Sequence, residues 1–353
     1  MSHVWDVAVD IDQPLARWRR YDAALERKCV KSREFSRPAL FTSLIHEQPV
    51  VFSNLCIPIE RSDANRQQAL LDGIKNKIPR AERIKVRAGR TETPIHLSSR
   101  DLVARWNRGK AMLCVTDFHF RETRLEHAVD LRSLSEFNLL AHGGGSMAVQ
   151  EMMTLVMSSQ GAFTDSHSDD PDGSNHCVCG RKLWLVWDTQ EGRKAGLEDV
   201  ERDIVYGRAA FDLSAFCRLQ SSRWLTVGPG ETLFLPGRFT HRVITLERYL
   251  GFGSFFVSFP NLLQTITRWS ILPPLWTVQR GNDHLVDTIL AFAIGRLREL
   301  LAASSSARDA WGLNHLRLGV RRWFRLTPGA DRRHILGRLG VSEFVRLAKQ
   351  IGT

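Results

Sequence analysis

The chain has 353 residues, of which 43% are apolar and 25% are charged, and its formal net charge is +11. These proportions are ordinary for a globular protein, so they exclude wholesale disorder and fibrous or collagen-like architectures. The length fits about two domains, or one large β domain with helical additions. Charged residues interrupt the longest apolar stretch, Leu285 to Ala303, so we expect no membrane span. The N-terminus lacks the pattern of a secretory signal, which favours an intracellular protein, cytoplasmic or, in a eukaryote, nuclear.

The six cysteines show no spacing typical of a disulfide framework, which agrees with a reducing compartment. Cys177 and Cys179 would supply half of a zinc site, but the sequence has no Cys-x-x-Cys or His-x3-His pair to complete four ligands. The favoured interpretation is two buried thiols on one face of a strand.

Residues 1–144 are predicted to form helices and strands that pack on the main domain. The first forty or so residues are rich in charge and carry no motif. After them, the β-branched run at 48–55 indicates a buried strand, 64–75 and 101–108 indicate helices, and 110–117 indicates a second strand.

After a glycine-rich joint at 143–146, closely spaced strands are predicted, which is typical of an antiparallel sandwich or barrel. This domain is expected to span residues 145–261. Its strands are expected at 147–158, 175–186, 231–235, 242–246 and 250–259. The stretch 188–222 has helical character and is too long for a hairpin loop. It therefore predicts an insertion at one end of the barrel, where long segments shape substrate access.

Residues 262–353 are predicted to form a basic helical region. An apolar stripe at helical spacing runs along Leu285, Ile289, Leu290, Ala293 and Leu297, and Ser342 is the expected cap of the last helix. The region has 14 Arg or Lys against 6 Asp or Glu. Such a surface fits nucleic acid, acidic protein or anionic lipid. Because the charges alternate with apolar residues at helical spacing, a solvated helix face is favoured over a nucleic-acid site.

A metal-binding pattern involves two histidines and an aspartate. His167 and Asp169 are separated by one residue, so on an extended strand both side chains point to one face. His241 follows a Gly-Pro-Gly hairpin that is expected to return the chain to the same end of the barrel. Two histidines and one carboxylate on a β scaffold form the facial triad of non-haem Fe(II) oxygenases, which leaves positions open for co-substrate and oxygen. Asp170 competes with Asp169, but the period-two spacing favours Asp169.

Lys182 lies in a strand otherwise made of Leu, Trp and Val. A lysine that points inward from such a strand is a costly buried cation unless it meets an anion, and a bound dicarboxylate would supply one. Thr164, three residues before His167, would donate a hydrogen bond to the same carboxylate. The plainer alternatives are a surface lysine with its head in water and, for His241, an ordinary core histidine.

These residues belong to four short motifs: Thr164-x-x-His167-x-Asp169, Gly180-x-Lys182-x-Trp184, Pro236-x4-His241 and Phe252-Gly-Ser-Phe-Phe. In this order and spacing, they resemble the catalytic barrel of the JmjC family of Fe(II)- and 2-oxoglutarate-dependent oxygenases, within the cupin class. The resemblance covers about residues 145–260, with weaker similarity back to Pro49. It implies a mainly β core with α additions: a double-stranded β-helix (jelly-roll or cupin) flanked by N-terminal helices and a C-terminal helical region.

The resemblance implies that His167, Asp169 and His241 bind Fe(II), and that Lys182 and Thr164 bind the co-substrate 2-oxoglutarate. With O2, the family's reaction converts 2-oxoglutarate to succinate and CO2 and hydroxylates a C–H bond. The substrate is then a protein side chain or a small molecule. A hydroxylated N-methyl group loses formaldehyde, so demethylation of N-methyl-lysine stays open as an alternative.

The sequence has no cysteine pattern of a chromatin reader, which favours a stand-alone hydroxylase. A catalytically silent cupin-type binding or scaffold protein is the third hypothesis, and the intact triad with Lys182 disfavours it. Alternation along the strand does not assign His176 or Asp165, so they stay candidates for the surroundings of the site, as do Asn175 and Ser174. By resemblance, the C-terminal helices are expected to form a homodimer or to cover the site.

Overall fold

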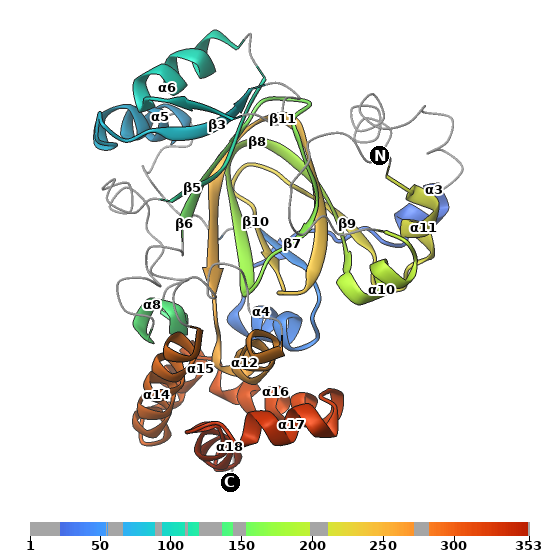
Figure 1. Ribbon diagram of the computed structural model, residues 1–353, viewed down its shortest axis with the longest axis vertical. Helices are drawn as coiled ribbons and strands as arrows, with labels where there is room; N and C mark the ends of the chain where they lie inside the picture. The colour runs from blue at the N-terminus through green and yellow to red at the C-terminus, as the bar shows by residue number, and fades with distance from the viewer. Residues whose placement is uncertain are drawn as a thin grey trace.

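The structure is a computed structural model of the chain, and it describes residues 22–53, 55, 66–88, 94–109, 112–119, 136–143, 153–197, 211–271 and 282–351. In this part of the chain, eleven strands form one strongly curved sheet with helices around it (Figure 1). The strands are β1 (Arg33–Glu34), β2 (Val50–Ser53), β3 (Ile84–Ala88), β4 (Ile95–Leu97), β5 (Leu113–His119), β6 (Met153–Ser158), β7 (Phe163–Ser168), β8 (Asp172–Asp188), β9 (Arg223–Val227), β10 (Thr232–Leu235) and β11 (Phe239–Phe256).

Two long strands, β8 and β11, form the centre of the sheet and pair antiparallel along nearly their whole length. Along the edge that does not face its long partner, each of these two strands pairs with two shorter strands. β9 and β10 pair with different parts of β8, and β7 and β6 pair with different parts of β11. The longest path through the sheet runs β1-β2-β10-β8-β11-β6-β5-β3-β4. Among these described pairings, only that of β1 with β2 is parallel.

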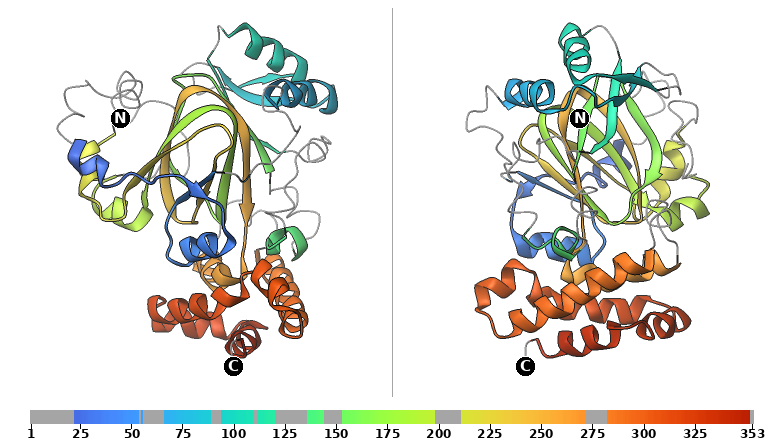
Figure 2. Two further views of the ribbon diagram at one scale, coloured as in Figure 1. Left: turned by 180° about the vertical axis from the view of Figure 1, so that it is seen from behind. Right: turned by 60° about the vertical axis from the view of Figure 1, so that its left-hand side comes forward.

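The helices lie at the two ends and along one side of the sheet. They are α3 (Asp22–Glu26), α4 (Arg37–Ile45), α5 (Arg66–Lys77), α6 (Ser99–Arg108), α8 (Leu139–Gly143), α10 (Thr189–Lys194), α11 (Leu213–Arg218), the 3-10 turn η3 (Phe259–Asn261), α12 (Leu262–Ile271), α14 (Asn282–Leu301), α15 (Ser305–Ala310), α16 (Leu313–Leu326), α17 (Gly329–Leu336) and α18 (Val341–Lys349). α5 and α6 lie at one end, and α12 to α18 form a layer at the opposite end (Figure 2). Within the described ranges, no helix is long and apolar enough to cross a membrane.

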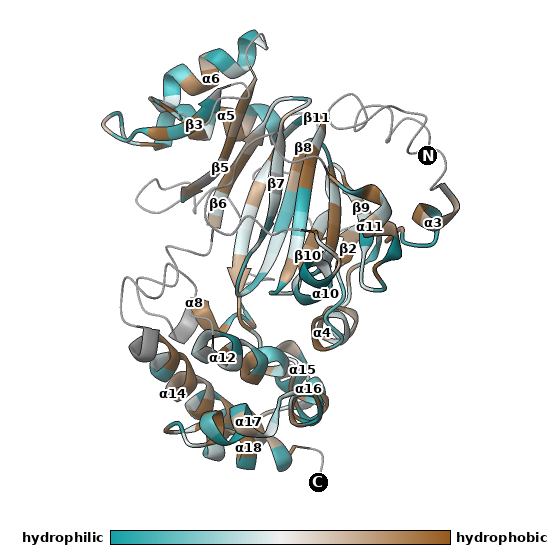
Figure 3. Cartoon of the chain, turned by 45° about the vertical axis from the view of Figure 1, so that its right-hand side comes forward, coloured by the Kyte–Doolittle hydropathy of each residue, from teal (hydrophilic) through white to brown (hydrophobic). Residues whose placement is uncertain are grey.

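The C-terminal helices share one hydrophobic core with the sheet, which runs from Leu40 to Ile351 in the sequence. The ring of Phe259 in η3 is parallel to that of Phe344 in α18, with centroids 6.2 Å apart. The indole N–H of Trp323 in α16 donates to the Thr267 hydroxyl of α12 at 2.7 Å. α14 is largely apolar along its length in Figure 3. The helical layer is therefore packed firmly on the strand ends.

Most of the elements predicted from the sequence are present, and a β-rich core with helical additions is confirmed. Two details are wrong. The strands predicted at 242–246 and 250–259 are the single strand β11, because irregular pairing between residues 245 and 251 lets it bend without a turn. Ser342 does not cap the last helix: α18 begins directly after Gly340, and the Ser342 hydroxyl donates to the Leu336 carbonyl.

The N-terminal region contributes strands to the same sheet as the rest of the chain. β2 pairs with β10 and β5 pairs with β6, so the sheet crosses the expected boundary at residue 144. The expected insertion at 188–222 contains α10 and α11. Its residues 198–210, and residues 144–146 of the expected joint, lie outside the described residues.

Candidate metal centre

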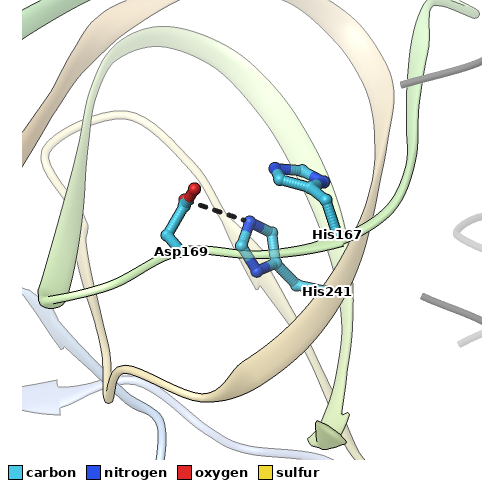
Figure 4. A group of neighbouring side chains, drawn as sticks. All are labelled: His167, Asp169 and His241. Atoms are coloured by element: carbon cyan, nitrogen blue, oxygen red, sulfur yellow. Dashed lines mark ion pairs between the residues drawn. The ribbon is translucent and has the colours of Figure 1, made fainter. Parts of the chain in front are cut away.

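His167, Asp169 and His241 lie side by side (Figure 4), and their ligand atoms are all within 4.8 Å of one another. The two histidines are directly opposite each other on the paired strands β7 and β11, with ring centroids 4.2 Å apart. Asp169 follows β7, and its Oδ2 lies 3.6 Å from Nε2 of His241. Antiparallel strand pairing thus brings together residues that are far apart in the sequence.

The protonation of His241 suits it to bind a cation. Burial, followed by the neighbouring His167, lowers the pKa of His241 well below its usual value, so the imidazole is neutral near pH 7. Its Nδ1 lies 3.1 Å from the carbonyl oxygen of Phe239. Because a carbonyl only accepts hydrogen bonds, Nδ1 carries the proton and Nε2 presents a lone pair.

The lone pair of His241 faces the carboxylate of Asp169, which is also an electron-pair donor. Two such donors repel each other unless a cation lies between them. Two imidazoles and a carboxylate suit divalent first-row metal ions, and the hydrogen bond from Nδ1 to the backbone is the usual device that orients a metal-binding histidine. The residues present therefore fit a divalent metal ion.

Asp170 is not a member of this group. Its carboxylate accepts hydrogen bonds from Nε and Nη2 of Arg268 on α12, at 3.2 and 3.1 Å. The structure thus groups Asp169, the aspartate that the spacing favours, with the two histidines.

Lys182, Thr164 and Trp184 share a sheet face with the two histidines. Residues directly opposite on neighbouring strands point to the same face, and so do alternate residues along one strand. On β11, position 241 faces His167, position 243 faces both Thr164 and Trp184, and position 245 faces Lys182. The predicted co-substrate residues Lys182 and Thr164 therefore lie on the same sheet face as the two histidines predicted to bind the metal.

Lys182 is a buried cation, only 3% exposed. Burial lowers the pKa of its ammonium group to about 8, and the neighbouring Cys114 and Cys177 oppose this shift. Its Nζ lies 4.7 Å from the centre of the Tyr249 ring, a cation–π contact. Within the residues that the structure describes, no carboxylate forms an ion pair with it. A buried ammonium in this position is suited to receive an anionic ligand.

Sequence analysis missed Tyr249. Its hydroxyl donates to Oδ1 of Asn175, and burial raises the pKa of the phenol well above its usual value, so it stays protonated. The residue therefore fixes the Asn175 amide while its ring lies against Lys182. Its neighbours in the sequence are ordinary for a strand, and the rarity of tyrosine, three in the whole chain, is a weak signal that was not used.

The other polar residues expected near the site have partners of their own. The Ser174 hydroxyl lies 2.5 Å from that of Ser254 and 3.1 Å from Nε2 of His176. Nδ1 of His176 lies 2.9 Å from the Thr232 hydroxyl. His176 is therefore a core histidine with both ring nitrogens engaged. The side chain of Asp165 lies outside the described residues.

Trp184 lies beside the His-Asp-His group, with its ring 5.3 Å from that of His241 and tilted by 34°. Its indole Nε1 is buried and has no hydrogen-bond partner among the described residues. An unpartnered buried donor is costly, so this N–H would suit a ligand that binds beside the His-Asp-His group.

Cys177 and Cys179 fit the prediction of two buried thiols on one strand face only in part: Cys177 is buried, but Cys179 is partly exposed and packs against a different hydrophobic cluster. The thiol of Cys177 donates to the carbonyl oxygens of Cys179 and Gly180, and burial raises the pKa of both thiols. A metal ligand has to be the thiolate. In the described part of the chain, these cysteines join no group of metal ligands.

The protein is expected to lose stability in acid partly through His176. Burial lowers the pKa of this imidazole to about 3, so below about pH 6.5 the unfolded chain binds a proton that the folded protein does not. Neutral His176 makes its full contribution to the free energy of unfolding above about pH 6.5, and this contribution is lost as the pH falls towards 3. His176→Gln is expected to reduce the slope of unfolding free energy against pH by up to about 1.4 kcal/mol per pH unit. Urea unfolding at about pH 7, 5.5 and 4.5 measures it, and an unchanged slope would show that His176 is not the group concerned.

Comparison with known protein families and with curated proteins found no match to the chain.

Proposed function

We propose that the protein is an Fe(II)- and 2-oxoglutarate-dependent dioxygenase of JmjC type, which hydroxylates a C–H bond of a protein side chain or a small molecule. One observation carries the proposal. A single sheet face holds both a His-Asp-His group and a buried ammonium without a described acidic partner. A divalent metal and a dicarboxylate are the ligands that suit these two neighbouring groups.

The proposal includes a double-stranded β-helix as the fold of the strand core. Its support is the sharing of each central strand between two sets of partners, β9 and β10 on β8, and β7 and β6 on β11. Barrels of this kind carry functional side chains on their inner face. The two histidines, Thr164 and Lys182 share one face in the same way.

Each residue then has a defined part. His167, Asp169 and His241 would hold the metal, with the backbone carbonyl of Phe239 fixing the ring of His241. Fe(II), when bound, supplies the redox chemistry that couples O2 and 2-oxoglutarate to substrate oxidation. The Lys182 ammonium would neutralise the far carboxylate of the co-substrate, and the Thr164 hydroxyl would donate to it. Burial of both side chains strengthens these contacts, because water competes little there.

The test is succinate production from 2-oxoglutarate by the purified protein with Fe(II), ascorbate and oxygen. We expect slow turnover without added substrate, and a loss of more than about 100-fold in His167→Ala, because removing a metal ligand costs more than removing its outer partner. His315→Ala is the matched control, since His315 lies on α16 in the C-terminal layer, and it is expected to retain the wild-type rate.

Two results would overturn the proposal. One is a wild-type protein that binds neither Mn(II) nor 2-oxoglutarate, which would favour a binding or scaffold role. The other is succinate production that persists in His167→Ala. Formaldehyde released with N-methyl-lysine peptides would assign the same chemistry to demethylation.

A further inference from the structure

A buried ionic cluster lies next to the metal-binding residues, and the proposed reaction does not use it directly. We call it the Arg268 cluster, and it consists of Arg268, Asp170, Asp172, Asn261 and Gly237. Arg268 extends from α12 and contacts Asp170 through two nitrogens, at 3.1 and 3.2 Å. One of these two nitrogens, Nη2 of Arg268, also lies 3.6 Å from Oδ1 of Asp172.

The cluster is closely packed and shielded from water. The side chain of Asp172 is fully buried, and that of Arg268 is 9% exposed. Asp172 also accepts from the backbone N–H of Gly237 at 2.8 Å and from the Asn261 amide at 2.7 Å. A Cβ atom at Gly237 would lie 2.7 Å from Nη2 of Arg268, so only glycine lets the guanidinium approach this closely.

Both segments that bear metal ligands pass through the cluster. Asp170 directly follows Asp169, and Gly237 lies in the turn that leads from β10 to His241. The backbone N–H of Arg238 also donates to the carbonyl oxygen of Asp169 at 3.4 Å. Arg268 therefore ties together, from the C-terminal helical layer, the two turns on which Asp169 and His241 depend.

We propose that Arg268 is a positioning residue for the metal centre: it holds Asp170 away from the metal, so that Asp169 alone supplies the carboxylate, and it sets the spacing between the two ligand-bearing segments. The inference rests on the proposed function, because it presupposes that the His-Asp-His group binds a metal. A guanidinium suits this task, since its rigid, forked donors contact several carboxylate oxygens at once.

The test measures binding of Co(II) alone, whose visible spectrum reports the geometry of its ligands. In Arg268→Met we expect affinity for Co(II) to fall about 10- to 100-fold, the usual effect of losing an outer partner of a metal ligand, with an altered spectrum. Adding Asp170→Asn to this variant is expected to restore part of the affinity and the wild-type spectrum, because it removes the competing carboxylate.

The matched control is Arg322→Met. Arg322 also links the C-terminal layer to the rest of the protein, through Glu47 at 3.2 Å. Among the described residues, it forms no hydrogen bond or ion pair with the segments that bear His167, Asp169 and His241. It is expected to lower the melting temperature without changing Co(II) affinity. This separates a positioning role from a loss of stability.

If Arg268→Met does not fold, Arg268→Lys tests the positioning role instead. It keeps the positive charge and replaces the forked guanidinium with a single ammonium. We expect it to fold and to bind Co(II) about 3- to 10-fold more weakly. Wild-type affinity and spectrum in folded Arg268 variants would overturn this inference and leave the proposed function standing. Failure of the wild-type protein to bind Co(II) would overturn both.

Discussion

Lys182→Met is expected to weaken the binding of 2-oxoglutarate by about 30-fold or more, because truncating one partner of a buried charge pair costs about 2 to 5 kcal/mol. The free energy of unfolding is expected to stay the same or to rise. The variant replaces a buried ammonium, which lacks an anion in the unliganded protein, with an apolar side chain of similar length. Calorimetric titration of the Mn(II)-loaded protein with 2-oxoglutarate measures the affinity, and urea unfolding measures the stability.

The control is Lys194→Met, because Lys194 is an exposed lysine on α10, and wild-type affinity is expected. The pH dependence gives a second check. Since the pKa of Lys182 is lowered to about 8, the ammonium is present below this pH and is lost above it. Wild-type affinity is therefore expected to fall as the pH rises from about 7 to 9, and Lys182→Met is expected to abolish this fall. Equal affinities in the two variants would show that the co-substrate does not meet Lys182.

Gly319→Ala is expected to destabilise the protein by about 3 kcal/mol, a large effect for one methyl group. Gly319 lies in α16 where that helix crosses η3. A Cβ atom there would lie 2.0 Å from the carbonyl oxygen of Pro260, and a backbone oxygen has no rotamer by which to move aside. The helix would have to move away from η3 and from the aromatic contacts around Phe259. Urea unfolding measures the loss.

Gly295→Ala is the matched control. Gly295 is also inside a C-terminal helix, α14, but a Cβ atom there meets none of the described residues within 4 Å. Alanine is the better helix former, so this variant is expected to gain about 0.5 to 1 kcal/mol. Similar behaviour of the two variants would contradict the close crossing of α16 and η3.

The sequence predicted those parts of the site whose residues lie close together along the chain. His167 and Asp169 share a face because a strand alternates with period two, and a lysine among apolar strand residues indicates a buried cation. The β-rich core and most helices were also accessible, because apolar periodicity and turn residues are local signals. The link to His241 came from the Gly-Pro-Gly hairpin before it, which was expected to return the chain to the same end of the barrel, and the resemblance supported it.

The remaining features depend on contacts between distant segments. Tyr249 meets Lys182 and Asn175 only after β8 and β11 pair, and nothing in its own segment marks it. Arg268 looks like one more arginine on an amphipathic helix until the fold brings it to Asp170. β11 was predicted as two strands because the sequence of its irregular middle resembles a turn. The residues before and after this middle both pair with β8, so the strand is continuous.

The order in which the chain is made bears on when the sheet can close. Phe52 of β2 pairs with Thr232 of β10, and His167 of β7 pairs with His241 of β11, so in each case the earlier strand leaves the ribosome long before its partner exists. Such long-range pairing makes folding slow, because the entropy of closing a large loop is lost before the contacts form. His167, Asp169 and His241 cannot meet until residue 241 has been synthesised, so a metal that needs all three residues would be captured only after the earlier strands have been made.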